Sequence, residues 1–338
     1  MKDILISVVV PVYGVENRIR KFAKSLFSQT MTKGVEFIFV DDASKDNSIS
    51  ELMSELDNYP NVSHSIHVIK HEFNRGLPSA RNTGLSAAHG EYVINFDSDD
   101  YLERDILERL YLKAKAENLD IVWSDWIEER EDGNSVKVTE PSYSNPEDAL
   151  RAMLIGPMRY NVWNKLIRRD ILINNHVSFP DGYPMGEDMT IMIIMASAQR
   201  VGKVDGYLYH YMRYSGGSIT SAYSERNMLQ LKYNVERVNE YLVKRFGERY
   251  DLDIAYMKLG IKSVYLVSGI SWKYFKTWRT LFPEANIYAG KNSRAAKRIS
   301  ILEWCAARNM YPVIWLFNLF VVLGYNGIKR KLAGRQSR

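Results

Sequence analysis

The chain has 338 residues, of which 46% are hydrophobic and 25% charged, with a net charge of +5 and a single cysteine, Cys305. This is the composition of a globular protein with room for two or three packed units, and it excludes a disordered chain. One cysteine excludes an internal disulfide, and the N-terminus carries no basic and apolar leader, so a cytoplasmic protein is expected.

The first hundred residues alternate strand and helix patterns. Strand-like apolar runs lie at 4–10, 35–40, 65–69 and 91–96, and helical spacings lie at 16–28, 47–56 and 79–88. This alternation predicts an α/β fold with a mostly parallel sheet flanked by helices. Ligands of such sheets bind at the carboxyl ends of the strands. Three groups of residues occupy these ends: Pro11-Val12-Tyr13, Asp41-Asp42 and Asp97-Ser98-Asp99.

The pattern is mixed from residue 105 to about 222 and helical beyond it. A helix at 106–117, a strand at 120–125 and a helix after Pro146 continue the first unit, and helices are expected at 225–246 and 254–281. We therefore predict one domain over 1–222, with halves at 1–104 and 105–222, and a helical C-terminal region over 223–338.

The C-terminal third is basic and aromatic. Residues 257–338 hold 15 Lys and Arg against 2 Asp and Glu, which indicates nucleic acid or an anionic membrane as partner. The apolar run at 310–323 favours the membrane and is shorter than the roughly 18–20 residues that span a bilayer. An interfacial helix is one interpretation and a buried core helix is the other. In the first, the aromatic residues near the headgroups are Trp304, Tyr311, Trp315 and Tyr325.

The three aspartates at 97, 99 and 100 follow a strand that its own pattern predicts to be buried. Asp99 or Ser98 could cap a helix that begins near Leu102. Clustered carboxylates also repel one another unless a cation lies between them, and a hard divalent ion prefers such oxygen ligands. An EF-hand loop is excluded because its glycine and glutamate are missing. By residues alone, metal binding and capping both stay open.

Four motifs occur in order: PVYGVE at 11–16, VDDASKDNS at 40–48, NRGLPSARNTGLSAAHGEY at 74–92 and FDSDD at 96–100. Together they resemble the family 2 glycosyltransferases of the GT-A fold, over roughly residues 4–220. The stretches at 161–172, 179–189 and 207–220 are similar to the acceptor half of the bacterial single-transfer members.

The resemblance implies a site for a nucleotide-sugar donor. In such a site, Pro11, Val12 and Tyr13 would pack on the base and ribose. Asp42 would accept a hydrogen bond from a base N–H such as that of uracil, and Arg81 would offset diphosphate charge. The donor residues implied are Pro11, Val12, Tyr13, Glu16, Asp41, Asp42, Arg81, Asp97 and Ser98. A helix-capping role for the Asp41-Asp42 pair and a surface position for Arg81 are the structural alternatives.

The same resemblance implies a metal and a general base. Asp97 and Asp99 would form a DxD motif, with Asp99 the direct ligand of Mn²⁺ or Mg²⁺. His210 would be a third ligand or contact the diphosphate, although an aromatic-flanked histidine can be structural. Asp188 would be the base, unless it is only a first-turn acid of the following helix. The acceptor region implied comprises Trp163, Lys165, Glu187 and Arg213.

Missing motifs narrow the expected activity. No QxxRW follows the Glu187-Asp188 pair, which disfavours a processive synthase, and no GxGxxG or GxxxxGK[ST] indicates a dinucleotide enzyme or a P-loop protein. We expect an inverting, metal-dependent glycosyltransferase that uses a nucleotide-sugar, UDP-linked, and a glycan or lipid-linked glycan acceptor of the cell surface. It would lie on the inner membrane face and bind no nucleic acid, and a homo-oligomer is compatible with the sequence. A nucleotidyltransferase and a catalytically silent binding protein are the alternatives.

Overall fold

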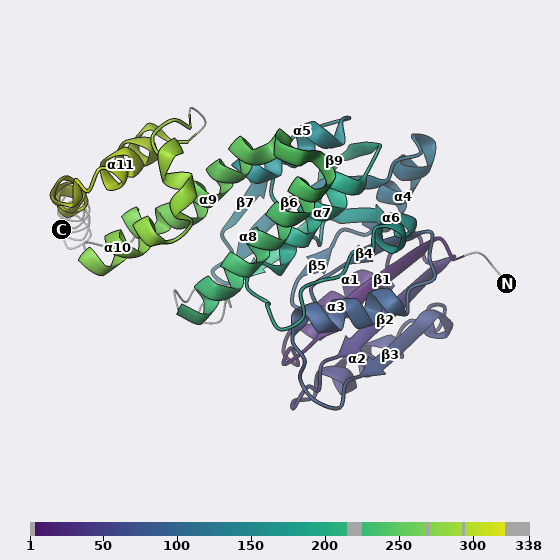
Figure 1. Cartoon of the computed structure of the whole chain (residues 1–338). Coiled ribbons are helices and arrows are strands. Elements are labelled where there is room, and N and C mark those ends of the chain that lie inside the picture. The colour runs from purple at the N-terminus through teal and green to yellow at the C-terminus, as the bar shows by residue number, and fades with distance from the viewer. Residues whose placement is uncertain (1–3, 215–224, 268–270, 293–294, 322–338) are drawn as a thin grey trace, which may run out of the picture. The chain divides into compact units, whose positions relative to one another are not determined.

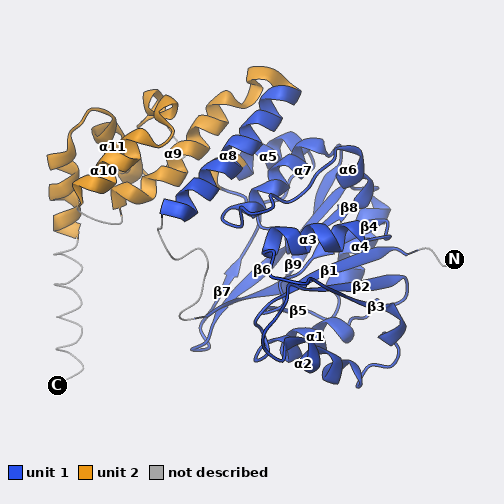
Figure 2. Ribbon diagram, turned by 60° about the horizontal axis from the view of Figure 1, so that its bottom comes forward, with its two compact units in different colours: residues 1–153, 157–245 blue, residues 154–156, 246–338 orange. Residues whose placement is uncertain are grey.

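The computed structural model describes residues 4–214, 225–267, 271–292 and 295–321 (Figure 1). It divides into two compact units, Met1–Met153 with Pro157–Arg245 and Leu154–Gly156 with Phe246–Arg338 (Figure 2). The division at 245 lies beyond the expected boundary at 222. Helix α8 (Glu225–Phe246) belongs to the first unit because its side chains, Asn234 among them, hydrogen-bond to the segment before α7 (Thr190–Ser197).

The first unit is built on a nine-stranded sheet with the order β3-β2-β1-β4-β8-β6-β9-β5, and β7 pairs with β6. Strands β1 to β4 are parallel, β8 runs antiparallel between β4 and β6, and β6 and β9 are parallel. The predicted α/β class is therefore confirmed. The strands are β1 (Ile6–Val12), β2 (Val35–Asp41), β3 (Ile66–Lys70), β4 (Tyr92–Asn95), β5 (Tyr101–Leu102), β6 (Ile121–Arg130), β7 (Ser135–Val138), β8 (Lys165–Arg168) and β9 (Val201–Arg213).

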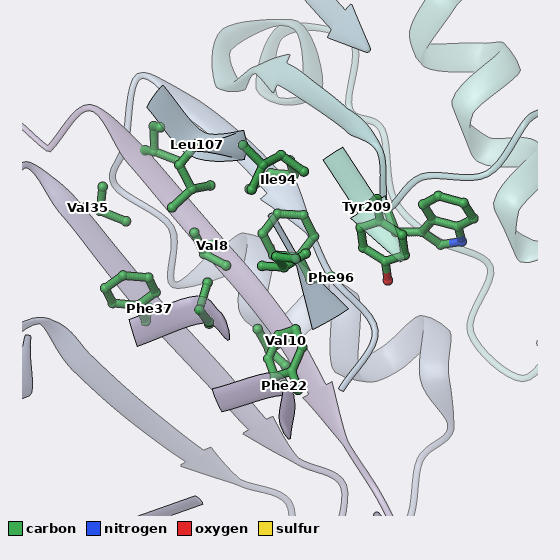
Figure 3. Close-up of a cluster of buried hydrophobic side chains, with 14 of the residues drawn as sticks. Val8, Val10, Phe22, Val35, Phe37, Ile94, Phe96, Leu107 and Tyr209 are labelled. Carbon is green, nitrogen blue, oxygen red and sulfur yellow. The ribbon is translucent and has the colours of Figure 1, made fainter. Parts of the chain in front are cut away.

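Helices cover both faces of this sheet (Figures 1 and 2). Alternate residues of β1, such as Val8 and Val10, share one core cluster with α1 and α4 (Figure 3). Val9 points to the other face, where α3 approaches so closely that a Cβ at Gly84 would lie 2.3 Å from Val9 Cγ1. The helices of this unit before α7 are α1 (Ile19–Phe27), α2 (Ser48–Leu56), α3 (Leu77–Ser86), α4 (Ile106–Ala116), α5 (Pro146–Ile155) and α6 (Arg169–Asn174).

Aromatic side chains fasten α1 to the sheet. The ring centroid of Phe27 lies 6.1 Å from those of both Phe37 and Phe39 of β2, in edge-on contacts. All three side chains are buried. Burying a side chain of this size contributes about 1.5–3 kcal/mol. The apolar residues of the helix predicted at 16–28 thus form the face of α1 that packs on β1 and β2.

Some elements differ from the sequence prediction. Strands β7 and β8 have only four residues each, too short to show a period, and they were not predicted. The helix expected at 254–281 is two helices, α9 (Asp251–Val267) and α10 (Trp272–Thr280). Helix α10 begins after Ser271, whose hydroxyl accepts a hydrogen bond from the Lys273 N–H.

The second unit is helical. It contains α9, α10, α11 (Lys297–Ala307) and a helix at 311–321, and its core includes Phe275, Trp278, Cys305 and Ile314. No helix within the described residues is long and apolar enough to cross a membrane. The last two residues of the apolar run at 310–323, and Tyr325 with the basic tail, lie outside the described residues.

Candidate active site

The carboxyl ends of three neighbouring strands meet at one edge of the sheet. Strand β1 pairs in parallel with β2 on one side and with β4 on the other. The residues that follow these strands therefore converge, as expected for parallel strands. They include Tyr13, which is 50% exposed, and the buried Asp42. Asp97 follows β4 at the same edge.

Asp42 supports a loop. Its Oδ1 accepts a hydrogen bond from the Arg75 N–H at 2.8 Å, and its Oδ2 accepts one from the Gly76 N–H at 2.7 Å. The Nδ1 atom of His71 also lies 2.7 Å from Oδ1. Both oxygens thus accept hydrogen bonds from the loop before α3, and the contact of Asp42 with a base N–H stays a prediction. Within the described residues, the side chain of Asp41 accepts one hydrogen bond, from the Ser44 N–H to its Oδ1 at 2.8 Å.

Glu16 ties two strand-end loops together. Its Oε2 accepts a hydrogen bond from the Asn47 N–H at 3.0 Å, and its own N–H donates to Oδ2 of Asp46 at 3.1 Å. Asp46 in turn accepts from the Ser48 hydroxyl at 2.6 Å, at the start of α2. Glu16 therefore holds the loop after β1, which carries Tyr13, against the loop after β2.

Arg81 links the carboxylates of two separate motifs. Its side chain is 1% exposed and comes from α3. It donates to Oδ1 of Asp97 at 2.9 Å, to Oδ1 of Asp188 at 3.0 Å and to Oε1 of Glu187 at 2.5 Å. We call these four residues the arginine network. The surface position considered for Arg81 is wrong, because one buried guanidinium joins residues 16, 106 and 107 positions away.

The arginine network carries more negative than positive charge. Burial would lower the pKa of Arg81, but Glu187, Asp97 and Asp188 together raise it. Burial raises the pKa of Asp97, and it raises the pKa of Glu187 well above its ordinary value, because one guanidinium is shared among three carboxylates. Oε2 of Glu187 is buried without a hydrogen-bond partner within the described residues. The network is therefore a region to which a further cation would be attracted.

Asp99 lies beside a cation from the start of the chain. Its Oδ2 lies 3.6 Å from Nη1 of Arg18, and the Asp99 side chain is 37% exposed. The Arg18 guanidinium also stacks on the ring of Tyr214, 3.6 Å from its centroid, and the Tyr214 hydroxyl donates to the Asp99 carbonyl at 2.9 Å. Removal from solvent and then the charge of Asp97 raise the pKa of Asp99 to about 6.

The third aspartate of this segment has a structural role. Asp100 is buried, its Oδ2 accepts from the Tyr209 hydroxyl at 2.5 Å and its Oδ1 accepts from the Met212 N–H at 2.7 Å. It therefore fastens the segment after β4 to β9. Helix capping explains none of the three aspartates, because β5 follows them and α4 begins only at Ile106.

Asp97 and Asp99 fit a metal that is held partly by its substrate. Within the described residues, no group of three or more His, Cys, Asp or Glu side chains is arranged to hold a metal ion. Mg²⁺ is usually bound through one or two carboxylates together with substrate phosphates, without a cage of protein ligands. Asp99 supplies a partly exposed carboxylate, and Asp97 lies close enough to shift its pKa. The carboxylates present thus suit a divalent cation that completes its shell with a diphosphate and water.

Asp188 and Glu187 face different surroundings. They form a short 3-10 turn, Glu187–Met189, directly before α7, as the sequence predicted for the start of a helix. The Asp188 side chain is 34% exposed, whereas that of Glu187 is 4% exposed. Only Asp188 can therefore reach a bound substrate, while Glu187 lies behind it against Arg81.

Helix α8 holds the segment that carries Asp188. The side-chain amide of Asn234 donates to the carbonyls of Tyr183 and Met185, at 3.1 and 3.0 Å. The rings of Tyr183 and Tyr233 stack with centroids 3.7 Å apart. Since Asn234 is fully buried, these contacts limit the movement of the segment. Nothing in the sequence marks Asn234 as part of the site, because the helix pattern around it is ordinary.

His210 is enclosed by carboxylates. Its Nδ1 lies 2.8 Å from Oε1 of Glu129, and its Nε2 lies 2.9 Å from Oε1 of Glu103. Its ring stacks on Tyr101 with centroids 4.2 Å apart. With both ring nitrogens engaged, the structure does not support His210 as a metal ligand. Arg213 likewise donates to Glu128 at 2.8 Å at the end of β9, which gives it a surface ion pair.

Trp163 and Lys165 support the site from within the core. The Trp163 ring is buried and stacks on Tyr209 with centroids 4.2 Å apart. The ammonium of Lys165 is fully buried and donates to the Asn161 carbonyl at 2.7 Å and to Oδ1 of Asn164 at 2.8 Å. Burial lowers the pKa of Lys165 to about 8. Both residues therefore shape the loop before β8 and are not exposed to an acceptor.

Two further residues of this region were not predicted. Arg18 lies beside Asp99, as described above. The pKa of Tyr160 is raised first by burial and then by the charge of Asp188, which indicates that the two side chains lie near each other. Neither belongs to a motif, and each reaches the site only through the pairing of distant strands. An aromatic or basic residue in a loop is too common a signal to have identified them.

Comparisons with known proteins agree with this geometry. Residues 7–178 match the family model described as glycosyl transferase family 2. A cholesterol galactosyltransferase of Borreliella burgdorferi is 31% identical over 296 residues, which cover 80% of this chain and 79% of that protein. A poly(ribitol-phosphate) beta-glucosyltransferase of Bacillus spizizenii is 32% identical over 214 residues, which cover 61% of this chain and 32% of that protein. The chain spans about half, 52%, of the protein EpsH of Bacillus subtilis, with 34% identity over 186 residues.

The fold also matches a solved structure. The crystal structure of S. aureus TarS 1-349 in complex with UDP-GlcNAc superimposes with a TM-score of 0.70 and 20% identity, over 92% of this chain and 90% of that chain. This likeness covers both the sheet and the helices that follow it, and it supports the GT-A fold expected from the motifs. Because the family model covers half of the chain and a relative matches four-fifths of it, the chain belongs to glycosyl transferase family 2 and is a glycosyltransferase.

Proposed function

We propose that this glycosyltransferase is an inverting, metal-dependent enzyme that transfers a sugar from a nucleotide-sugar, most simply a UDP-sugar, to a hydroxyl of a glycan acceptor of the cell surface. The observation that carries the proposal is the arginine network, which places the DxD carboxylate Asp97 and the carboxylate Asp188 on one buried guanidinium. A donor-side residue and an acceptor-side residue are thereby held next to each other, as a direct displacement requires.

The donor half of the proposal rests on the carboxyl edge of the sheet. Tyr13 offers an exposed aromatic face to a base, and Asp42, proposed to accept from a base N–H, lies with Asp41 at the end of β2, where both are buried. Pro11, Val12 and Ser98 lie at the same edge and are buried there. The structural neighbour TarS was solved with UDP-GlcNAc, which makes UDP the first nucleotide to test.

The acceptor half rests on Asp188. Its partly exposed carboxylate would accept the proton of the acceptor hydroxyl as that oxygen attacks the sugar carbon from the face opposite the leaving diphosphate. Arg81 donates a hydrogen bond to Asp188 and so holds its carboxylate in place, and α7 begins two residues after it. A divalent cation held by Asp99 and Asp97, Mn²⁺ or Mg²⁺, would supply positive charge to the leaving diphosphate.

A thermal-shift panel tests this function. The full chain is heated with UDP, GDP, dTDP and CMP, alone and as sugar conjugates, with and without Mn²⁺. A ligand at 100 times its dissociation constant stabilises the folded state by about 2.7 kcal/mol, which is measurable. We expect a metal-dependent shift with UDP compounds that Asp99→Ala abolishes and Asp105→Ala, at an aspartate that pairs with Arg109 before α4, retains. No shift with any nucleotide would contradict the donor half.

We further propose that the second unit binds an anionic membrane surface, which would bring the enzyme to a lipid-linked acceptor. Large apolar side chains are exposed on its last two described helices, with Phe320 at 72% and Ile301 at 59%. Cations lie among them, because Arg298 and Arg308 cover the rings of Phe317 and Trp304. Exposed apolar residues interspersed with basic ones are typical of helices that lie in a headgroup layer. The relative from Borreliella burgdorferi acts, by its name, on a lipid, cholesterol.

Vesicle sedimentation tests the membrane proposal. The full chain is mixed with phosphatidylglycerol vesicles and with phosphatidylcholine vesicles. We expect sedimentation with the first, and a large loss of it in Phe320→Asp. The matched control is Leu229→Asp, which places the same charge at an apolar residue that is 64% exposed on α8 in the first unit. Equal binding by both variants, or no binding by the wild type, would contradict this proposal.

A further inference from the structure

A polar groove lies beside the segment that carries Asp188. Its volume is about 460 Å³, within the range of about 300–1,000 Å³ that is usual for small-molecule sites. Its walls come from three parts of the first unit: α3, the segment at 177–181 and α8. Residues that matter for its chemistry are Asn82, Ser86, Phe179, Asp181, Tyr233 and Arg237. We call it the α3–α8 groove.

The groove is preformed. Nδ2 of Asn82 donates to the Phe179 carbonyl at 2.9 Å, and the Phe179 N–H donates back to Oδ1 of Asn82 at 2.7 Å. Oδ1 of Asp181 accepts from the Ser79 hydroxyl at 2.8 Å and from Asn82 at 3.0 Å. These bonds fix the segment at 177–181 against α3, so a ligand would meet a wall that is already in place.

The groove shares its walls with the catalytic segment. Nη2 of Arg237 donates to the hydroxyl of Thr190 at 2.6 Å, two residues after Asp188. On the other side, the ring of Phe179 lies 5.4 Å from the Arg81 guanidinium, which is bonded to Asp188. A molecule in the groove would therefore meet two residues, Arg237 and Phe179, that also contact the surroundings of Asp188.

The charges of the groove favour a neutral ligand. Arg237 brings one cation, which makes no ion pair in the part of the chain that the structure describes, and its Nε is buried without a partner there. Asp181 brings one carboxylate to the same groove. A phosphate would be attracted by the first and repelled by the second, whereas a molecule with several hydroxyls can donate to Asp181 and accept from Arg237.

The groove also presents an aromatic surface. Tyr233 lines it and is 40% exposed, and its ring is held by the stack on Tyr183. An aromatic ring with a hydroxyl combines an apolar face with a polar tip, which suits a ligand that has both kinds of surface. A sugar ring has such surfaces, with C–H groups on its faces and hydroxyls at its rim.

We propose that the α3–α8 groove is an accessory saccharide site, which holds a neutral sugar unit of the acceptor glycan away from the unit that receives the new sugar. The proposal rests on the proposed function for the identity of the acceptor, but its binding step does not need turnover. It implies that the enzyme prefers an acceptor of several sugar units, because a single unit at Asp188 would leave the groove empty.

Saccharide binding to the full chain tests the proposal directly. Neutral tetrasaccharides built of glucose, galactose, N-acetylglucosamine, mannose or rhamnose are offered to the protein, and binding is observed by saturation-transfer difference NMR. Ser86→Trp fills the groove from an exposed position on α3. In the described structure the hydroxyl of Ser86 bonds only to the Asn82 carbonyl of the same helix. Ser50→Trp, at an exposed position on α2, is the matched control.

We expect at least one tetrasaccharide to bind the wild type and Ser50→Trp in the millimolar range, and to lose most of this binding in Ser86→Trp. Circular dichroism and the nucleotide-induced thermal shift verify that Ser86→Trp is folded. Equal binding by Ser86→Trp and the wild type, or no binding of any tetrasaccharide to the wild type, overturns the proposal. Failure of the proposed function would instead appear as a missing nucleotide shift, which this experiment measures separately.

Discussion

Replacing Arg81 with glutamine would expose how much the arginine network contributes to stability. The guanidinium is 1% exposed and bonded to three carboxylates, two of which, those of Asp97 and Glu187, lose much of their hydration in the folded state. Removing one partner of a buried ion pair costs about 3–5 kcal/mol, because the other partner remains buried and uncompensated. We expect Arg81→Gln to lose free energy of unfolding in this range near neutral pH, with EDTA present so that no metal replaces the lost cation. Arg81→Lys should lose less, since it keeps the charge but not the fork of donors.

The loss should depend on pH in a direction set by Glu187. Burial raises the pKa of Glu187 in the folded protein, so its contribution to stability is complete below its ordinary pKa of about 4.3 and is lost as the pH rises through the raised value. Without Arg81 this pKa rises further. The difference in unfolding free energy between wild type and Arg81→Gln should therefore be smaller at about pH 5 than at about pH 8.

Urea unfolding, followed by circular dichroism at several pH values, measures this difference. The control is Arg213→Gln, which removes an arginine with a 56% exposed side chain that, within the described residues, forms one ion pair, to Glu128. Surface ion pairs of this kind contribute about 0–1 kcal/mol. The reasoning is refuted if Arg81→Gln is no less stable than this control, or if its loss is the same at both ends of the pH range.

Three further outcomes follow from the site. Asp188→Asn should lower sugar transfer by about 10²–10⁴ while keeping the nucleotide-induced thermal shift, because a positioned base acts on the chemical step; retained transfer would exclude Asp188 as the base. His210→Gln should keep the metal dependence of that shift, since Glu129 and Glu103 already occupy the ring nitrogens, and a lost dependence would show that His210 is a ligand after all. Trp163→Ala should lose about 3–5 kcal/mol of unfolding free energy because its ring is buried, and a loss as small as that of Trp272→Ala, at a residue 56% exposed, would contradict its place in the core.

The sequence was sufficient for the class of fold and for the edge of the sheet where the site lies. The run ILISVVV is apolar at every position except Ser7 because strand β1 is covered on both faces, and this is visible without a structure. Carboxylates placed directly after such runs must lie at the strand ends, since the chain leaves the sheet there. A helix pattern does not show on which unit the helix packs, and the compact units divide at residue 245, beyond the boundary predicted at 222.

Only the tertiary structure decided which partner each polar side chain takes. Asp97, Asp99 and Asp100 look alike in the sequence, yet one meets Arg81, one meets Arg18 and one holds β9. The pairing of β5 with β9 brings residues more than 100 positions apart into contact. A hydrogen bond depends on distance and direction in space, and these follow from the strand order, which no local pattern records. The sequence by itself thus determined the kinds of groups at the site, and the fold of the whole first unit determined their pairing.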